Sequence, residues 1–247
     1  ANRAANDEGI TWDELIEFIN TKLFPALKNL KASETNKMSY IVKGVFEDSF
    51  NYMKSGVLFR QVINKIDEID FNKKTELHIF NDIYEKILND LQNAGSYGEF
   101  YTPRAVTQFM VEMVDPQLGE LVLDPACGTG WFLTGTIEHI RTKYVKNPDQ
   151  ERELQEHVHG IEMKPLPHLL ATTNLLLHGI DTPIHLKHDD TLSKPIKDIW
   201  IRDQVDVVFA NPPFGGTITD GILANFPKSF HTKQTESLFM VYIMTIL

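Results

Sequence analysis

The sequence predicts an α/β fold in which a parallel sheet follows an all-α region. Two observations lead to this prediction. From residue 121 onward, short apolar runs alternate with amphipathic stretches, a pattern typical of parallel strands with helices on both faces. Residues 1–95 instead carry apolar side chains at helical spacing with little alternation. We therefore expect a helical N-terminal domain over residues 1–95 and an α/β domain over residues 96–247.

The N-terminal region contains several predicted helices. Thr11, followed by Asp13 and Glu14, resembles a helix N-cap with acids in the first turn. Further helices are predicted over residues 38–53, 57–67 and 76–93. This region is expected to form a bundle that packs on itself and on the next domain. A partner-binding surface is an alternative that can coexist with such packing. The small, glycine-rich residues 94–98 mark the expected domain boundary.

The α/β domain is expected to begin with a helix that Pro103 opens and that ends in a turn at Asp115. Strands are predicted over residues 121–124, 157–161, 184–188 and 205–210, and helices over residues 130–144 and 166–178. Residues 147–152 are expected to form a solvated loop, and residues 235–247 a buried helix. Because four strands make a thin sheet for this fold, we expect the domain to be C-terminally incomplete, truncated after its fourth strand.

The most informative motif, Asn211-Pro212-Pro213-Phe214, follows the last predicted strand. In an open α/β sheet, ligands bind at the carboxyl ends of the strands. The two prolines remove two backbone donors, so the turn mostly offers acceptors, among them the Asn211 side-chain oxygen and the Pro212 carbonyl. Such a turn suits a substrate that arrives as an amine donor. Phe214 is expected to stack on a planar ring beside it, with a core position below the loop as the alternative.

A glycine turn follows the first predicted strand. Residues 124–130 read Asp-Pro-Ala-Cys-Gly-Thr-Gly before a helix start. Gly128 and Gly130 allow positive φ and close approach of the backbone to a ligand. The dinucleotide pattern G-x-G-x-x-G is absent, because Leu133 occupies its last position. Asp124, a carboxylate at the strand end, suits a cationic or amine-bearing ligand better than a pyrophosphate.

The next two predicted strands also end in acids. Glu162 follows the second strand, where a carboxylate can accept hydrogen bonds from both hydroxyls of a ribose. Asp189 and Asp190 follow the third, where a carboxylate can accept from the exocyclic amine of an adenine. The sequence does not decide between these two aspartates. Three successive strands that end in an acid, followed by Asn-Pro-Pro-Phe, predict one ligand site at a shared sheet edge.

Residues 124–130 and 211–214 together resemble the amino-methylating DNA methyltransferases that use S-adenosylmethionine. Residues 98–104, which contain Phe-Tyr-Thr-Pro, resemble a box of the adenine-specific enzymes in which the cofactor half precedes the catalytic half. The helical region ahead of this box is similar to the modification (M) subunit of type I restriction-modification systems. The resemblance implies a Rossmann-like methyltransferase sheet that transfers a methyl group to the exocyclic N6 amine of a flipped adenine.

The resemblance also implies roles for individual residues. Expected cofactor contacts are Glu99, Phe100, Tyr101, Thr102, Pro103, Arg104, Asp124, Ala126, Gly128, Thr129, Gly130, Glu162 and Asp190. Expected catalytic residues are Asn211, Pro212, Pro213 and Phe214. Asp124 is implied to lie near the methionine amine of the cofactor. No metal is expected, because the nine histidines are scattered without convincing ligand spacing.

Charge and composition bear on the partners. The net charge of −10, from 24 basic and 34 acidic residues, is unfavourable for a chain that grips DNA alone. The resemblance implies a specificity (S) subunit that supplies the phosphate contacts, together with a second M subunit, and it allows a restriction (R) subunit as a further partner. No apolar run has the length of a membrane span, and no signal peptide is recognised. The single cysteine, Cys127, fits a reducing cytoplasm and is expected to be a packed residue, not a nucleophile.

Several alternatives remain open. The same box and motif order can occur in the methylase part of a single-chain restriction-modification enzyme. Asn-Pro-Pro-aromatic motifs also occur in methyltransferases that act on glutamine side chains or RNA bases, and cytosine amine methylation uses similar chemistry. For this chain alone, a non-enzymatic assembly and cofactor-binding module is a further interpretation.

Overall fold

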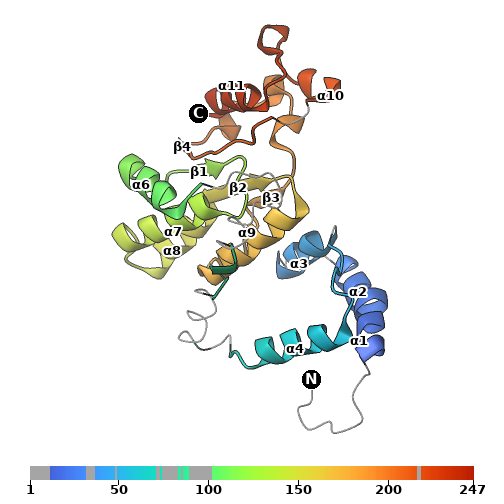
Figure 1. Cartoon of the computed structure of the whole chain (residues 1–247). Helices are drawn as coiled ribbons and strands as arrows, with labels where there is room; N and C mark the ends of the chain where they lie inside the picture. Colours follow the sequence, from blue (N-terminus) through green and yellow to red (C-terminus); the bar gives the residue numbers. More distant parts are fainter. Residues whose placement is uncertain are drawn as a thin grey trace. The chain divides into compact units, whose positions relative to one another are not determined.

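The computed structural model of the chain describes residues 12–31, 37–47, 49–70, 73, 83–84, 86–88, 102–215 and 218–247. The chain divides into two compact units, Ala1–Glu85 and Lys86–Leu247, and each is described by itself (Figure 1). The expected domain boundary at residues 94–98 lies outside the described residues, so the boundary at residue 95 stays a prediction. Of the helix predicted over residues 76–93, the described residues 83–84 and 86–88 are helical.

The described part of the N-terminal unit is helical, as predicted. Its elements are α1 (Trp12–Phe18), a π-helical turn (Ile19–Leu23), α2 (Phe24–Lys28), α3 (Lys37–Glu47) and α4 (Gly56–Asp67). Leu15 and Ile19 are buried on one face of the first helical stretch. Phe24 of α2 meets Phe46 of α3 edge to face, with ring centroids 5.1 Å apart. The Ser55 hydroxyl accepts a hydrogen bond from a backbone N–H of α4 and so caps that helix.

The second unit is an α/β domain. Its main elements are α6 (Arg104–Val114), β1 (Val122–Asp124), α7 (Trp131–Lys143), α8 (Pro148–His157), β2 (Val158–Glu162), α9 (Pro165–Leu177), β3 (Leu186–His188), β4 (Val207–Val208), α10 (Asp220–Leu223) and α11 (Thr235–Ile246). Short 3₁₀ turns cover Thr191–Ser193, Ile196–Asp198, Ile201–Asp203 and Lys228–Phe230. The strands form one sheet in the order β3-β2-β1-β4, and every described pairing is parallel. The predicted Rossmann-like sheet is therefore confirmed.

Helices cover both faces of this sheet (Figure 1). On one face, apolar side chains of α7, α8 and α9 pack against Val158 and Leu186 of the strands. On the other face, α11 packs against Leu123 and the segment that follows β3. Val122 and Leu123 point into different clusters, as the period of two in a strand requires. Among the described helices, none combines the length and the apolar character that crossing a membrane would require.

Several elements differ from the sequence-based expectation. The helix predicted over residues 38–53 ends at Glu47, and the described residues 49–53 are not helical. The strand predicted over residues 184–188 begins at Leu186. The loop predicted over residues 147–152 is wrong, because helix α8 begins at Pro148. The Asn147 side chain accepts hydrogen bonds from two backbone N–H groups of the first turn. Asn at the N-cap followed by Pro at the first helical position is a helix-start signal, and the loop prediction from polar composition did not take it into account. Strand β4 spans two residues where six were predicted. At the amino end of the predicted strand, the Val205 N–H donates to the Ile246 carbonyl of α11 instead of to a strand.

Gly160 lies at the centre of strand β2, where three side chains close in on it. A Cβ built at this position would lie 2.6 Å from Leu133 Cδ1, 2.9 Å from Leu186 Cδ1 and 3.3 Å from Cys127 Sγ. All three of these residues are buried. Protein interiors are packed like crystals, so these neighbours have little room to move. The absence of a side chain at Gly160 therefore lets α7 and the glycine turn approach the sheet.

Replacing Gly160 by alanine is expected to lower the free energy of unfolding by about 1–3 kcal/mol, because the added methyl overpacks the core. Chemical denaturation followed by circular dichroism measures this difference. Gly135→Ala on α7 is the matched control, since its Cβ would lie at an ordinary 3.9 Å from Val111 Cγ2 and alanine favours a helix. Equal stabilities of the two variants would contradict the prediction.

Candidate active site

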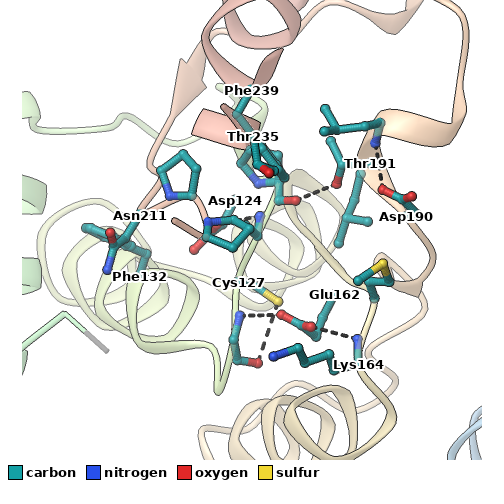
Figure 2. Close-up of a pocket in the computed structure, with 18 of the residues that line it drawn as sticks. Asp124, Cys127, Phe132, Glu162, Lys164, Asp190, Thr191, Asn211, Thr235 and Phe239 are labelled. Atoms are coloured by element: carbon teal, nitrogen blue, oxygen red, sulfur yellow. Dashed lines mark hydrogen bonds between the residues drawn. The ribbon is translucent and has the colours of Figure 1, made fainter. Parts of the chain in front are cut away.

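A cavity of about 380 Å³ lies at the carboxyl ends of the strands (Figure 2). Each strand contributes residues at or after its end, among them Asp124 of β1, Glu162 of β2, Asp189 after β3 and Asn211 after β4. The parallel arrangement explains this convergence, because the carboxyl ends of parallel strands meet at one edge. The volume lies within the range of pockets that hold small organic ligands.

The structure brings most of the predicted site residues together. Those that line the cavity are Thr102, Asp124, Ala126, Gly128, Thr129, Glu162, Asp190, Asn211, Pro212, Pro213 and Phe214. Asp189, the alternative to Asp190, also lines it. Glu99, Phe100 and Tyr101 lie outside the described residues, so their expected contacts stay predictions.

Pro103, Arg104 and Gly130 were predicted to contact a cofactor, but the structure does not bring them to the cavity wall. The Arg104 guanidinium lies over the Trp131 ring, 5.5 Å from its centroid. Its Nη2 atom is 3.7 Å from Glu138 Oε2. Gly130 has a φ of 85°, and a Cβ there would meet Ala171 of α9 at 3.4 Å. Arg104 and Gly130 therefore shape the start of α7, while the Pro103 carbonyl accepts hydrogen bonds in the first turn of α6.

Asp124 is a buried carboxyl group at the end of β1, with 2% of its surface exposed. Burial raises its pKa to about 8, and the nearby negative charge of Glu162 acts in the same direction. A hydrogen bond from the Ala126 N–H to Asp124 Oδ1, 3.0 Å long, opposes this shift. A cation placed beside Asp124 would stabilise its ionised form. The group is thus suited to bind a positively charged ligand atom.

Glu162 connects the turns after β1 and β2. Its Oε2 atom accepts a hydrogen bond of 2.9 Å from the Gly128 N–H. Its Oε1 atom accepts one of 2.7 Å from the Lys164 N–H, and Figure 2 shows both bonds. Each carboxylate oxygen has further acceptor capacity, which a ribose hydroxyl could use. Glu162 therefore holds the cavity wall in place and still offers acceptors to a ligand.

The turn after β3 carries two carboxylates that also bond to backbone donors. Asp189 Oδ1 accepts from the Asp190 N–H at 2.8 Å, and Asp190 Oδ1 accepts from the Leu192 N–H at 3.0 Å. The Thr191 hydroxyl donates to the Pro125 carbonyl, which joins this turn to the turn after β1. Both aspartates line the cavity with similar local bonding, so the prediction of an adenine contact in this turn applies equally to both.

The turn after β4 presents an aromatic ring to solvent. Phe214 is 60% exposed and lines the cavity, so the alternative of a core phenylalanine below the loop is wrong. Beneath the turn, Phe209 stacks on Phe132 of α7 with ring centroids 5.4 Å apart and planes 9° apart. The Phe209 N–H also donates to the Leu123 carbonyl of β1. These contacts fix the point from which residues 211–214 leave the sheet.

Some residues of the cavity wall were missed by the sequence reasoning. They include Lys164, Thr191, Thr235 and Phe239. Lys164 follows Glu162 by two residues, so its position after a strand end was an available signal. Thr235 and Phe239 lie four residues apart on α11, the spacing that places two side chains on one helix face. The sequence showed that this helix is apolar, but it did not show which face of the helix lines the cavity.

Cys127 is buried in the glycine turn, and burial raises the pKa of its thiol well above the usual range. The thiol therefore stays protonated and unreactive at neutral pH. Within the part of the chain that the structure describes, no group of three or more metal-binding side chains is found. The expectation that no metal is used stays a prediction.

Comparisons with known proteins point to one family. The family model described as N-6 DNA Methylase matches residues 75–247. The Type I restriction enzyme EcoEI methylase subunit of Escherichia coli is 55% identical over 245 residues, which are 99% of this chain and 50% of that protein. The chain thus spans about half the length of the curated relatives it matches.

Two solved structures resemble the fold closely. One is a modification subunit attributed to a type I restriction enzyme of Vibrio vulnificus YJ016, with a TM-score of 0.82 and 42% identity over 99% of this chain and 53% of that one. The other belongs to a study of complex assembly and conformational transition of the type I R-M system, with a TM-score of 0.85 and 35% identity over 97% of this chain and 48% of that one. Together with the family match over residues 75–247, these findings show that the chain belongs to the N-6 DNA methylase family.

Proposed function

We propose that this chain is the cofactor-binding and catalytic part of a type I modification subunit, which transfers a methyl group from S-adenosylmethionine to the N6 amine of a flipped adenine in DNA. The observation that carries the proposal is the single cavity that joins the acidic strand ends to Asn211-Pro212-Pro213-Phe214. Membership of the N-6 DNA methylase family supports the reaction class. The names of the relatives support the assignment to a type I system.

The acidic wall of the cavity suits S-adenosylmethionine. This cofactor supplies an activated methyl group on a sulfonium, and it carries an ammonium, two ribose hydroxyls and an adenine amine. Asp124, Glu162 and Asp190 offer carboxyl oxygens from the ends of three neighbouring strands. Asp124 would hold the ammonium, Glu162 the ribose hydroxyls, and Asp190 or Asp189 the adenine amine. Apolar liners such as Met163 provide contact area for the flat base.

Two buried polar atoms support the same fit. Thr129 Oγ1 and Trp131 Nε1 belong to residues that line the cavity, and neither has a hydrogen-bond partner among the described residues. Buried polar groups in native proteins are normally satisfied, so an orphaned group calls for an explanation. Both atoms can donate a hydrogen bond. An acceptor on a bound ligand, such as the carboxylate of the methionine moiety, would provide the missing hydrogen-bond partner after a small adjustment of the turn.

The residues after β4 would handle the target base. The adenine amine is a weak nucleophile, because its lone pair is delocalised into the ring. Asn211 Oδ1 and the Pro212 carbonyl would accept its two hydrogens and favour a tetrahedral nitrogen. Phe214 would stack on the flipped base, which cannot reach such a site inside the duplex. Catalysis then rests on alignment and electrostatic stabilisation rather than on a general base.

Partners follow from the charge. With a net charge of −10, the chain needs another subunit to hold the DNA phosphates, and a specificity (S) subunit would do so. A second M subunit and a restriction (R) subunit would complete the assembly. We expect this assembly to be located in the cytoplasm.

A cofactor-binding module without activity of its own is a second candidate function for the chain in isolation. It is supported because one of the chain's two units alone lines the described cavity.

Asn211→Ala is expected to lower methyl transfer by the assembled modification complex by about 10²–10³-fold, because one oriented acceptor at the reacting nitrogen is lost. Transfer of radiolabelled methyl groups to DNA that carries the recognition sequence measures the rate. Binding of S-adenosylmethionine, measured by calorimetry, should change less than about twofold, since Asn211 faces the base. Methyl transfer to protein or RNA but not to DNA would overturn the proposed function.

Glu162→Gln is expected to weaken S-adenosylmethionine binding by roughly tenfold to a hundredfold. The variant loses a charged hydrogen bond and turns an amide N–H₂ toward the Gly128 or Lys164 N–H. Isothermal titration calorimetry measures the dissociation constant. Glu112→Gln on α6 is the matched control, because Glu112 is an exposed residue outside the cavity. A similar loss in both variants would point to a nonspecific charge effect and contradict the role of Glu162.

Binding of S-adenosylmethionine is expected to release a proton near pH 7. With a pKa of about 8, the free Asp124 carboxyl is mostly protonated there, and a bound cation lowers that pKa. Affinity should therefore rise between pH 6 and pH 8, by at most about tenfold per unit for one proton. Calorimetry in two buffers of different ionisation enthalpy detects the release. Asp124→Asn should remove the buffer dependence, and a buffer-dependent enthalpy that persists in this variant would refute the assignment.

A further inference from the structure

Two pairs of histidine rings stack beside strand β3, one with a ring from strand β2 near the amino end of β3 and one with a ring from helix α9 at its carboxyl end. His159 stacks on His185 with ring centroids 4.4 Å apart, at the amino ends of the strands. His168 stacks on His188 with centroids 4.8 Å apart and planes 18° apart. His188 is the last residue of β3 and lies opposite Glu162 in the sheet register. The second pair therefore lies beside the cavity, although neither ring lines it.

His188 ties the end of β3 to the turn that follows β2. Its Nε2 atom lies 3.0 Å from the carbonyl oxygen of Met163. Because a carbonyl can only accept, Nε2 carries the proton and donates it to this bond. Met163 and the next residue, Lys164, both line the cavity. One imidazole of β3 thus restrains the backbone of the neighbouring cavity wall.

That backbone in turn holds the carboxylate of Glu162. The Lys164 N–H donates to Glu162 Oε1 at 2.7 Å, one residue after the carbonyl that His188 holds. The backbone of β3 adds a second link, because the Asp189 N–H donates to the Glu162 carbonyl at 3.2 Å. Displacement of the Met163 carbonyl would therefore move the donor that orients Glu162.

His168 keeps the ring of His188 in place from helix α9. His168 is 7% exposed, and its backbone N–H donates to the Lys164 carbonyl at 3.0 Å in the first turn of the helix. Burial and the neighbouring His188 lower the pKa of His168 to about 4, while a hydrogen bond to the backbone of Leu186 opposes this shift. His168 is therefore neutral near pH 7, and the stack avoids repulsion between two cations.

We propose that His168 and His188 are positioning residues for the cofactor cavity, which act by fixing the Met163–Lys164 backbone that orients Glu162. The inference rests on the proposed function for its ligand, since S-adenosylmethionine is the molecule that Glu162 would bind. The geometric part concerns the free protein and is testable without any ligand.

The decisive variant is His188→Phe, which keeps a flat ring for stacking but removes the donor to Met163. In the free chain, hydrogen–deuterium exchange of the Lys164 amide should become about two- to tenfold faster, the range expected for one lost hydrogen bond. The dissociation constant for S-adenosylhomocysteine, measured by calorimetry, should rise by a similar factor. His188→Gln keeps a side-chain N–H donor and should recover most of both values.

His185→Phe is the matched control, because it alters the other histidine stack beside β3. This variant also removes one hydrogen bond, since the Nε2 atom of His185 lies 2.8 Å from Glu156 Oε2 in the wild-type chain. Any loss of thermal stability should then be similar in the two phenylalanine variants. Exchange at Lys164 and binding of S-adenosylhomocysteine should nevertheless stay at wild-type values in His185→Phe.

The outcomes separate the inference from the proposed function. Unchanged Lys164 exchange in His188→Phe, or equal effects in His185→Phe, would overturn the positioning role. Faster exchange in His188→Phe alone would support it whatever the ligand. If the wild-type chain failed to bind S-adenosylhomocysteine while this exchange difference appeared, the failure would count against the proposed function and not against the positioning of Glu162.

Discussion

The parallel register of the four strands is the constraint on which the site depends. It brings Asp124, Glu162, Asp189 and Asn211 to one edge although about ninety residues separate the first from the last. Close packing surrounds Gly160 in the middle of this sheet, where a Cβ would meet side chains of α7 and β3. The bond from Gly128 to Glu162 then joins two of the strand ends directly. Sheet packing and ligand chemistry are therefore two aspects of one arrangement.

The electrostatics of the cavity complement this geometry. Carboxylates from three strand ends share a small volume, and burial holds the pKa of Asp124 near 8. The ionised form of such a carboxyl group is unfavourable in the free protein, and it becomes favourable when a cation binds beside it. Lys164, the one basic side chain of the described cavity wall, enters from the turn that also orients Glu162. The acidic strand ends thus favour a ligand that is itself positively charged.

Much of this arrangement followed from the sequence, because strand ends and turn residues are local signals. The strands, the glycine turn and the turn at residues 211–214 were each recognisable by spacing. What the sequence did not show depends on contacts between distant segments. Arg104 lies over Trp131, and its expected cofactor contact stays a prediction. Thr235 and Phe239 reach the cavity because α11 packs on one face of the sheet. Helix α8 was missed for another reason, since the Asn147 cap signal was present and the charged composition outweighed it.

The exposed ring of Phe214 has a consequence for how a complex with DNA would form. It stands on a turn in which Pro212 and Pro213 fix two successive φ angles, and below it Phe209 is stacked on Phe132. The backbone of such a turn has lost part of its conformational freedom before any partner arrives. Under the proposed function, base capture then requires little further ordering of this backbone. The motion and its free-energy cost fall on the nucleic acid, so mismatched or weakly stacked target bases should be captured more readily than paired ones.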